Sequence, residues 1–285
     1  MNRIKLFIFL FLLLFNFFNI SGQDYTFLNN LKEENTDYMG FYKKSREYNM
    51  LMKEKIKIVN LPEQNSFFAI WLSRDFNDQS TKRTLIAIHG SDGTVYPEIK
   101  DELEFAKKYK YAIVAIQWWL GKKDKYLEPK KVYEIIEIAV KYMNQKYNCS
   151  LNKNAYIGFS RGSVIGYEVT FWDKYKENNY LALTINHSGH MPPNLLTPFF
   201  QKLINGEYGS NAFSGKNFFV FCGLKDEEWQ DRQCHFMRFT KKIVEKFGGK
   251  IVGDIADPEG KHLGLRLNKE YHERAIKKFI ELTSE

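Results

Sequence analysis

The chain alternates short apolar runs with longer amphipathic segments. This order predicts an α/β fold with a mostly parallel, eight-stranded sheet and helices on both faces. Two further observations support this fold class. Several of the apolar runs contain hardly any polar residue, which is typical of strands that are covered on both faces. The composition, with 44% hydrophobic and 27% charged residues in a chain of 285, excludes a disordered chain, a collagen, a coiled coil and a multi-pass membrane protein.

Eight candidate strands begin near residue 54. In chain order they cover residues 54–60, 66–73, 84–89, 111–117, 154–158, 181–187, 217–222 and 250–255. The first two have no helix between them and therefore predict an antiparallel edge, whereas the others alternate with helical segments. No segment has the composition of a linker, so residues 54–285 are expected to form one domain. The polar and aromatic stretch 23–53 is expected to be a helical or irregular N-terminal wrap.

Helices are expected between these strands. Pro97 and Pro129 each suit the first position of a helix, and apolar residues recur on one face of both segments. A further helix is predicted over 227–247, where Gly248 supplies the stop. The last helix is predicted over 269–282.

The start of the chain has the pattern of a secretory signal peptide. A short basic region precedes the apolar run 6–18, and small or polar residues follow, with a cleavage site after Ser21 or Gly22. The sequence therefore predicts a signal peptide over 1–22 and a secreted or periplasmic protein. The run is shorter than the roughly 18 to 20 residues of a membrane-spanning helix, so no stable membrane insertion is expected after cleavage. An uncleaved anchor is the alternative.

The charge pattern bears on the partners. The formal net charge is +8, and the lysines are scattered rather than gathered in blocks. This pattern indicates a solvated surface and not a nucleic-acid groove, so no nucleic-acid partner is expected.

The three cysteines leave two interpretations open. Cys222 and Cys234 form the nearer pair and are candidates for a disulfide in an exported chain. The interpretation we favour is that these two and Cys149 are buried free thiols. No Cys/His spacing of a zinc site is present, so no metal site is predicted.

The pentapeptide Gly158-Phe159-Ser160-Arg161-Gly162 has the pattern G-x-S-x-G. It directly follows a predicted strand and precedes a helical segment, and such a strand–turn–helix presents the serine hydroxyl at the end of the sheet. Side chains at Gly158 and Gly162 would clash with neighbouring backbone. Ser160 is therefore the candidate nucleophile. The alternative is a serine that only caps a helix.

A serine nucleophile needs a base and an acid that orients the base. Of six histidines, His262 is the best candidate for the base, because its loop follows the last strand; His190 is second. His89 is expected to shape the turn after its strand, and His187 could line the pocket. His235 and His272 lie on predicted helices, and His272 is expected to face solvent. The candidate acid is Asp226, which follows the strand over 217–222. Its competitors are Glu227, Glu228, Asp231, Asp254 and Asp257.

An oxyanion hole is expected from two backbone amides. The turn His89-Gly90-Ser91-Asp92-Gly93 follows a central strand, and its glycines let N–H groups point toward the site. The Ser91 amide is the first candidate donor and Asp92 the second. The partner donor is the Arg161 amide at the start of the helix after Ser160.

With these motifs, the chain resembles the α/β-hydrolase family from about residue 54 to 283, in the order Ser160, Asp226, His262. Within that family it resembles secreted single-domain esterases of the polyhydroxybutyrate-depolymerase, feruloyl-esterase and acetyl-xylan-esterase type. That resemblance rests on the export signal, the His-Gly turn and the aromatic strand end at 117–121. It implies a serine esterase with an acyl-enzyme intermediate, no metal and no organic cofactor. Ser163 stands where many of these esterases have a further glycine, and the position of Arg161 also occurs in peptidase-like members.

Aromatic side chains are candidates for the substrate pocket. Trp118 and Trp119 leave a strand at the edge where active sites of parallel sheets lie, although core packing explains either one equally well. Tyr96, His190 and Trp229 are further candidates. The segment 188–216 is long enough for a small cap and too short for a large lid domain.

Three functions are compatible with the sequence. The first is a secreted carboxylic-ester hydrolase acting on a small-molecule or polymer-linked ester. The second is a serine peptidase of the same fold. The third is a non-catalytic binding protein on a hydrolase scaffold, which the presence of all three triad candidates argues against.

Overall fold

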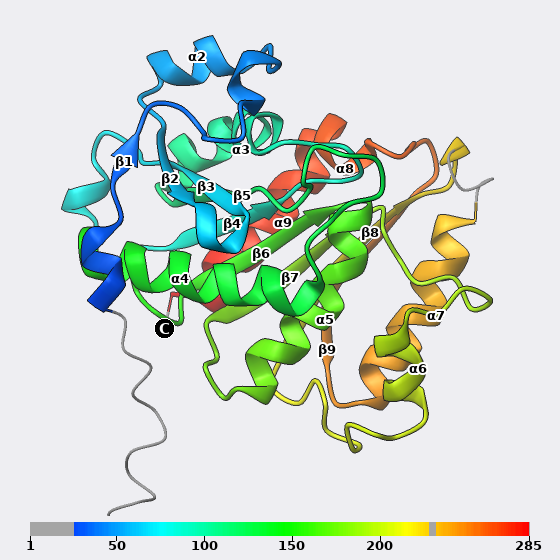
Figure 1. Ribbon diagram of the computed structural model, residues 1–285. Coiled ribbons are helices and arrows are strands. Elements are labelled where there is room, and N and C mark those ends of the chain that lie inside the picture. Colours follow the sequence, from blue (N-terminus) through cyan, green and yellow to red (C-terminus); the bar gives the residue numbers. More distant parts are fainter. Residues whose placement is uncertain (1–25, 228–231, 285) are drawn as a thin grey trace, which may run out of the picture. The chain divides into compact units, whose positions relative to one another are not determined.

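A computed structural model describes residues 26–227 and 232–284, and the sheet formed by these residues has nine strands (Figure 1). The predicted signal peptide over 1–22 lies outside the described residues. The residues Thr26–Asn30 form a 3-10 helix within a separate N-terminal unit that ends at Leu31. The fold described below is that of the unit Lys32–Glu285.

The strands follow the predicted segments closely. They are β1 Glu33–Glu34, β2 Lys57–Leu61, β3 Ser66–Trp71, β4 Thr84–Ile88, β5 Ala112–Ile116, β6 Asn154–Phe159, β7 Leu181–His187, β8 Asn217–Gly223 and β9 Lys250–Asp257. Their order in the sheet is β1-β2-β3-β5-β4-β6-β7-β8-β9. The strands β1, β2 and β3 are antiparallel, β3 pairs antiparallel with β5, and all other neighbours are parallel. The predicted antiparallel edge and parallel centre are confirmed.

The helices lie between the strands as expected. They are α2 Tyr48–Lys53, α3 Val95–Tyr109, α4 Pro129–Tyr147, α5 Arg161–Tyr175, α6 Pro198–Ile204, α7 Gln233–Lys246, α8 Gly264–Leu267 and α9 Lys269–Leu282. Short 3-10 helices cover Phe41–Lys43, Pro62–Gln64 and Phe76–Asp78. Pro129 is the first residue of α4, as predicted. The helix that contains Pro97 begins two residues earlier, at Val95. The predicted helix over 227–247 is shorter, because α7 begins at Gln233.

The ninth strand corrects the expected number of eight. It lies in the predicted N-terminal wrap, where Glu33 pairs with Val59 in the edge strand. The Glu33 carboxylate contacts Lys57 at 2.8 Å and Lys146 at 3.0 Å and also accepts a hydrogen bond from Tyr142 at 3.1 Å. Burial pushes the pKa of Glu33 up, but the bonds from Lys57, Tyr147 and Lys146 outweigh it and lower the pKa to about 2. A two-residue strand has no periodicity from which it could be predicted.

The core lies on both faces of the sheet, which β8 illustrates. Phe219 and Phe221 pack with residues of α3, α8 and α9, whereas Phe218 and Val220 pack with residues of α5, α6 and α7. Successive side chains of a strand point to opposite faces, so an all-apolar strand fits between two helical layers. Figure 1 shows α4 and α5 side by side on one face and α3 and α9 on the other. Because these strands are parallel, their carboxyl ends lie at one edge of the sheet. The candidate site residues lie in the loops that leave the strands at this edge.

Candidate active site

Ser160 occupies the sharp turn between β6 and α5. Its backbone dihedrals are φ 52° and ψ −117°, a conformation that residues other than glycine rarely adopt. The Ser160 amide donates a hydrogen bond to the His187 carbonyl at 2.8 Å, and its own carbonyl accepts from Val164. These bonds hold a strained turn with a partly exposed serine at the end of the sheet.

Glycines surround this turn because backbone segments approach one another closely there. A Cβ at Gly158 would lie 2.4 Å from the Gly162 carbonyl oxygen, and a Cβ at Gly162 would lie 2.6 Å from the carbonyl oxygens of His89 and Ile88. The predicted clash at both glycines is confirmed. Gly189, at the end of β7, is as restricted, since its Cβ would lie 1.9 Å from the Ser160 carbonyl oxygen.

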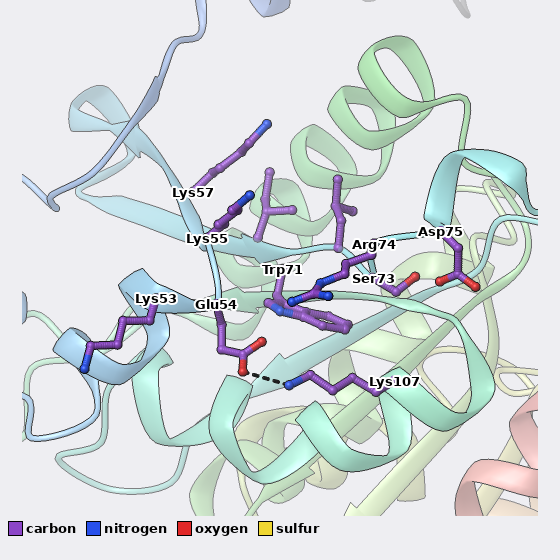
Figure 2. A pocket seen from close by; sticks show the side chains of 11 residues that line it. Lys53, Glu54, Lys55, Lys57, Trp71, Ser73, Arg74, Asp75 and Lys107 are labelled. Atoms are coloured by element: carbon purple, nitrogen blue, oxygen red, sulfur yellow. Dashed lines mark hydrogen bonds and ion pairs between the residues drawn. The ribbon is translucent and has the colours of Figure 1, made fainter.

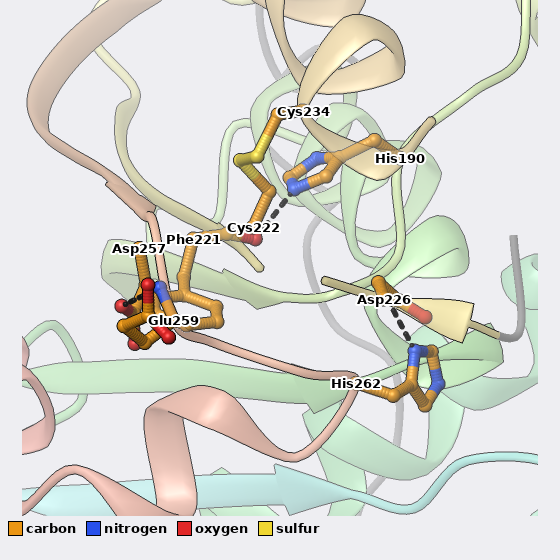
Figure 3. Close-up of a disulfide and its surroundings, with 8 residues drawn as sticks. All are labelled: His190, Phe221, Cys222, Asp226, Cys234, Asp257, Glu259 and His262. Atoms are coloured by element: carbon orange, nitrogen blue, oxygen red, sulfur yellow. Dashed lines mark hydrogen bonds and ion pairs between the residues drawn. A yellow bond between two sulfur atoms is a disulfide. The ribbon is translucent and has the colours of Figure 1, made fainter. Parts of the chain in front are cut away.

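His262 and Asp226 come together at the same edge. His262 follows β9, Asp226 follows β8, and His262 Nδ1 lies 2.8 Å from Asp226 Oδ2 (Figure 3). Asp226 is fully buried and His262 is 7% exposed. With the carboxylate at Nδ1, the imidazole donates its proton there, so that Nε2 is the ring nitrogen that can accept a proton. This is the arrangement that an oriented general base requires.

The competing acids have other partners. Glu227 binds Lys261 at 2.8 Å on the surface, Asp254 binds Lys241, and Asp257 accepts the amide of Glu259 at 3.0 Å. Glu228 and Asp231 lie outside the described residues. Among the candidate acids that the structure describes, Asp226 alone has a hydrogen bond to a candidate base.

The loop that carries His262 is anchored by Arg266. This residue lies in α8, directly after the loop, and its guanidinium pairs with Glu98 and, at 3.0 Å, with Asp101 on α3. The guanidinium also lies 4.3 Å from the ring centroid of Phe159, whose ring is 5.1 Å from that of His262. Arg266 therefore fixes both the residue before Ser160 and the loop of the candidate base.

The other histidines at this edge are buried and structural. His89 Nδ1 bonds to the Gly90 carbonyl at 2.8 Å, and its Nε2 accepts from the Trp118 amide at 3.4 Å, which confirms its role in the turn. His190 bonds to the Tyr167 hydroxyl at 2.9 Å and to the Phe221 carbonyl at 2.7 Å. Burial lowers the pKa of His89 and of His190 to about 4. Since both ring nitrogens of His190 are engaged, it is poorly suited to act as the base.

The two histidines on helices differ from each other. His235 is exposed on α7. His272 was expected to face solvent, and this prediction is wrong: it is 1% exposed on α9, with Nε2 2.8 Å from Glu102 and its ring against Phe105. A histidine with a buried carboxylate partner can replace an apolar residue on the inner face of a helix, so periodicity alone misplaced it.

Tyr126 orders the turn over residues 89–93, which holds the candidate oxyanion donor Ser91. Sequence reasoning did not identify this tyrosine. The Tyr126 hydroxyl accepts from the Asp92 amide at 2.8 Å and donates to Asp92 Oδ1 at 3.0 Å. The Asp92 amide is therefore occupied. No hydrogen bond of the Ser91 or Arg161 amides is found within the described part of the chain, and the amide of a first helical residue has no intrahelical partner. These two amides are the donors that remain for an oxyanion.

A cavity of about 560 Å³ opens beside Ser160. Of the candidate pocket residues, Trp118 and His190 line it, and so do Ser91 and Arg161, the candidate oxyanion donors. The rest of the lining is mainly apolar and comes from the α4 region, α5 and the segment after β7; it includes Leu127, Pro129, Val164, Ile165, Met191, Pro192, Leu195 and Leu196. The segment predicted as a cap, 188–216, thus contributes one wall, although its helix α6 begins only at Pro198.

Three predicted pocket residues are not among those that line the cavity. Tyr96 is fully buried and donates a hydrogen bond to Asp37 at 2.7 Å, so its assignment to the pocket is wrong. Trp119 packs on Phe41 with 5.5 Å between ring centroids and donates to the Lys122 carbonyl, so it too lies elsewhere. Trp229 lies outside the described residues. Trp118 is 2% exposed and donates to the His89 carbonyl at 2.9 Å, so it is a fixed part of the wall.

Cys222 and Cys234 form a disulfide, so the expectation of three free thiols is wrong for this pair (Figure 3). Their Cα atoms are 5.2 Å apart, within the range that a disulfide requires. The bond joins the end of β8 to the first turn of α7, and the loop between them contains Asp226. Cys149 is the buried free thiol of the described residues.

Among the described residues, Ser160 Oγ and the His262 imidazole are not hydrogen-bonded to each other. Such bonds are often long before substrate binds. The three candidates nevertheless follow the parallel strands β6, β8 and β9; β8 and β9 are neighbours in the sheet, and β7 lies between β6 and β8. The nucleophile, acid and base candidates therefore meet at one edge of the sheet.

Comparison with known proteins is informative for the structure only. No protein-family model matches the chain, and no curated protein matches its sequence. Solved structures do match. A structure from a study of two fungal esterases from Rhizomucor miehei has 14% sequence identity and a TM-score of 0.60, with 85% of this chain and 89% of that chain covered.

Two further structures give the same result. A truncated carbohydrate esterase from gut microbiota has 14% identity and a TM-score of 0.56, covering 76% of this chain and 91% of that one. An esterase from Pyrococcus furiosus has 14% identity and a TM-score of 0.55, covering 81% and 87%. The chain has the α/β-hydrolase fold. At this identity the likeness establishes the α/β-hydrolase fold alone, and its activity has to be argued from the site.

Within the described residues, no group of three or more His, Cys, Asp or Glu side chains could hold a metal ion. No helix within 26–227 and 232–284 is long and apolar enough to cross a membrane.

Proposed function

We propose that this protein is a serine hydrolase that cleaves carboxylic esters through an acyl-enzyme intermediate. The observation that carries the proposal is the buried 2.8 Å pair of His262 and Asp226 at the edge of the sheet where Ser160 occupies a strained turn. The esterase neighbours in fold are in accord with this activity. A merely structural serine would need neither the strained backbone nor an oriented histidine on the neighbouring loop.

The reaction follows from the roles of these groups. Ser160 Oγ attacks the ester carbonyl carbon while His262 takes the hydroxyl proton at Nε2, and Asp226 stabilises the imidazolium. The negative charge that forms on the carbonyl oxygen is bound by the Ser91 and Arg161 amides. The ester C–O bond then breaks, and the alcohol leaves with the proton from His262. Water, deprotonated by His262, attacks the acyl carbon and releases the acid.

The cavity supports a substrate with an apolar part beside the scissile bond. Its walls carry Val164, Ile165 and Leu127, and its volume of about 560 Å³ suits a small organic group. The cavity admits either a small ester or an ester side group of a polymer.

A serine peptidase is the second candidate. Asp124 and Glu128 line the same cavity, and two carboxylates near a nucleophile suit a substrate with an amino group. Asp124 is only weakly engaged, since its ion pair with Arg161 spans 3.8 Å and its side chain is 70% exposed. Hydrolysis of a peptide amide with a free amino group at rates above those of neutral esters would favour this candidate.

The proposed location is outside the cell membrane, as a secreted or periplasmic protein. It rests on the signal peptide predicted over 1–22. N-terminal sequencing of the native protein tests it, and a mature chain that begins at Gly22 or Gln23 is the expected result.

The experiment that tests the activity is labelling with a fluorophosphonate, read by intact mass and peptide mapping. The wild type should gain one adduct, on Ser160, and Ser160→Ala should gain none. Ser91→Ala is the matched control, because it removes a hydroxyl from the same cavity and keeps the backbone amide; it should be labelled. Absence of an adduct on folded wild type would contradict the proposal and favour a non-catalytic binding protein.

A further inference from the structure

A second, larger cavity, of about 710 Å³, is lined by residues that do not line the cavity beside Ser160 (Figure 2). Its walls come from α2 and the turn after it, from the end of β3 and the residues that follow, and from α3. We name it the basic pocket, after its cationic lining residues Lys53, Lys55, Lys57, Arg74 and Lys107. Only two acidic residues, Glu54 and Asp75, share the lining.

The charges of the basic pocket are not balanced. Glu54 is engaged by Lys107 at 2.8 Å, Asp75 by Lys110 at 2.7 Å, and Lys57 by Glu33 at 2.8 Å. Lys53, Lys55 and Arg74 are exposed, and within the described part of the chain none of them has a carboxylate partner. Three cations thus remain available around one cavity, where their fields add.

The floor of the basic pocket holds two side-chain donors. Trp71 lines the cavity and is 3% exposed, and within the described residues its indole N–H donates to no protein acceptor. Ser73 also lines it, next to Asp75, and its hydroxyl is one of the groups that lower the pKa of the Asp75 carboxyl. A ligand in the cavity would therefore meet donors as well as cations. Figure 2 shows the indole in the middle of the lining side chains.

The strand register separates the basic pocket from the catalytic residues. Trp71 pairs with Ile113, near the beginning of β5, because β3 runs antiparallel to the central strands. The basic pocket therefore opens at the amino-terminal edge of the parallel sheet. Ser160 lies at the carboxyl-terminal edge, beyond the end of β6. No residue lines both cavities.

We propose that the basic pocket is a second, non-catalytic binding site for a small oligoanion, a molecule with two or more sulfate, phosphate or carboxylate groups on a compact organic body. More than one anionic group is expected because the available cations come from two walls, Lys53 and Lys55 from one and Arg74 from the other. The cavity volume accommodates a molecule the size of a di- or trisaccharide. The indole N–H of Trp71, which lines the cavity, can donate a hydrogen bond to an oxygen atom of this ligand.

The test is calorimetric titration of the full protein with two probes. Sucrose octasulfate represents the sulfated class and trigalacturonate the carboxylated class, each measured at low and at physiological salt. The test variant is Lys53→Gln/Lys55→Gln/Arg74→Gln. The matched control is Lys202→Gln/Lys250→Gln/Arg274→Gln, which removes the same residue types from exposed positions elsewhere. Hydrolysis of a small neutral ester is measured in parallel.

The proposal predicts saturable, one-to-one binding of at least one probe to the wild type and weaker binding at higher salt. Affinity should fall by about tenfold or more in the test variant and stay within about twofold in the control, since only the test variant loses local charge. Ester hydrolysis should be unchanged in both variants, which keeps this result independent of the proposed esterase activity.

Three results would overturn the proposal. The first is no saturable binding of either probe to the wild type. The second is an equal loss of affinity in both variants, which would indicate an effect of net charge only. The third is binding to vesicles with anionic headgroups together with no binding of either small probe, which would make this face a membrane-surface site.

Discussion

The two edges of the sheet differ in how they hold charged side chains. At the carboxyl-terminal edge, Asp226 is fully buried and paired with His262, and Arg266 is tied to two carboxylates. At the amino-terminal edge, Lys53, Lys55 and Arg74 are exposed and have no carboxylate partner among residues 26–227 and 232–284. The difference fits the two proposed functions. A catalytic site needs groups fixed before the substrate arrives, whereas an anion-binding site needs charges not yet neutralised by the protein.

The largest expected effect tests whether the proposed activity at the carboxyl-terminal edge requires Asp226. Asp226→Asn keeps the volume of the side chain and removes the charge that orients His262. We expect kcat/KM for a chromogenic ester to fall by about 10³- to 10⁴-fold with little change in the unfolding midpoint. Glu227→Gln, one residue later and exposed, should retain full activity. A loss of less than tenfold in Asp226→Asn would remove Asp226 from the triad.

The disulfide is the next test, because it constrains only the carboxyl-terminal edge. Cys222→Ser/Cys234→Ser should lower the free energy of unfolding by about 2 to 4 kcal/mol, measured by urea titration. Reduction of the wild type should have the same effect. Activity should be lost at lower urea than oligoanion binding in the basic pocket, since the freed loop carries Asp226. Parallel loss of both would show that the two edges unfold as one unit.

Acid pH should lower the free energy of unfolding through buried histidines at the carboxyl-terminal edge. Burial lowers the pKa of His89 and of His190 to about 4 and lowers that of His187 well below its ordinary value. For His89 and His190 the unfolded chain takes up a proton near pH 6.5 and the native state only near pH 4, and the pKa of His187 shifts in the same direction. Stability is therefore lost as pH falls through this window. Each of His89 and His190 should cost about 2 kcal/mol between pH 7 and pH 5.

Urea titrations at pH 7 and pH 5 measure this loss. His190→Gln should reduce the difference between the two pH values, and the exposed His235→Gln should leave it unchanged. Neutralising Lys53, Lys55 and Arg74 should not alter it either, because no histidine lines the basic pocket. Equal pH dependence in His190→Gln and wild type would contradict the assignment of the effect to buried imidazoles.

The smallest expected effect concerns Tyr126. Its hydroxyl holds both the amide and the carboxylate of Asp92, next to the Ser91 donor. Tyr126→Phe should lower kcat by about three- to tenfold and leave the unfolding midpoint within about 1 °C, a cost of about 1 kcal/mol in the transition state. The exposed Tyr175→Phe is the control. A change in KM alone would assign Tyr126 to substrate binding and not to the oxyanion turn.

The sequence predicted the parts of this fold that depend on local pattern. The strand segments, the turn at Ser160 and its glycines are encoded within a few residues of each other, and the structure has them where they were expected. The approach of Asp226 to His262 was predictable from strand order, because loops after parallel strands share one edge. What failed depended on tertiary contacts that no local pattern encodes. The pairing of Cys222 with Cys234 and the burial of His272 against Glu102 are of this kind.

Two features had no sequence signal at all. Tyr126 reaches Asp92 across 34 residues from a segment without regular structure. The basic pocket gathers residues from α2, β3 and α3, whose lysines look scattered along the chain. The prediction for Tyr96 was wrong for a related reason. Its neighbourhood in sequence suggested the pocket, but its hydroxyl donates a hydrogen bond to Asp37 from the N-terminal wrap. A side chain's environment is set by the packing of whole elements, which periodicity does not describe.

The most direct measurement of the central claim is to trap the acyl group. The wild type is mixed with an excess of a chromogenic acetyl ester, quenched in acid during turnover and analysed by intact mass and peptide mapping. The account predicts one acetyl group, on the peptide that contains Ser160, and none in Ser160→Ala. Turnover by the wild type with the acetyl group on another residue, or undiminished turnover by Ser160→Ala, would contradict it.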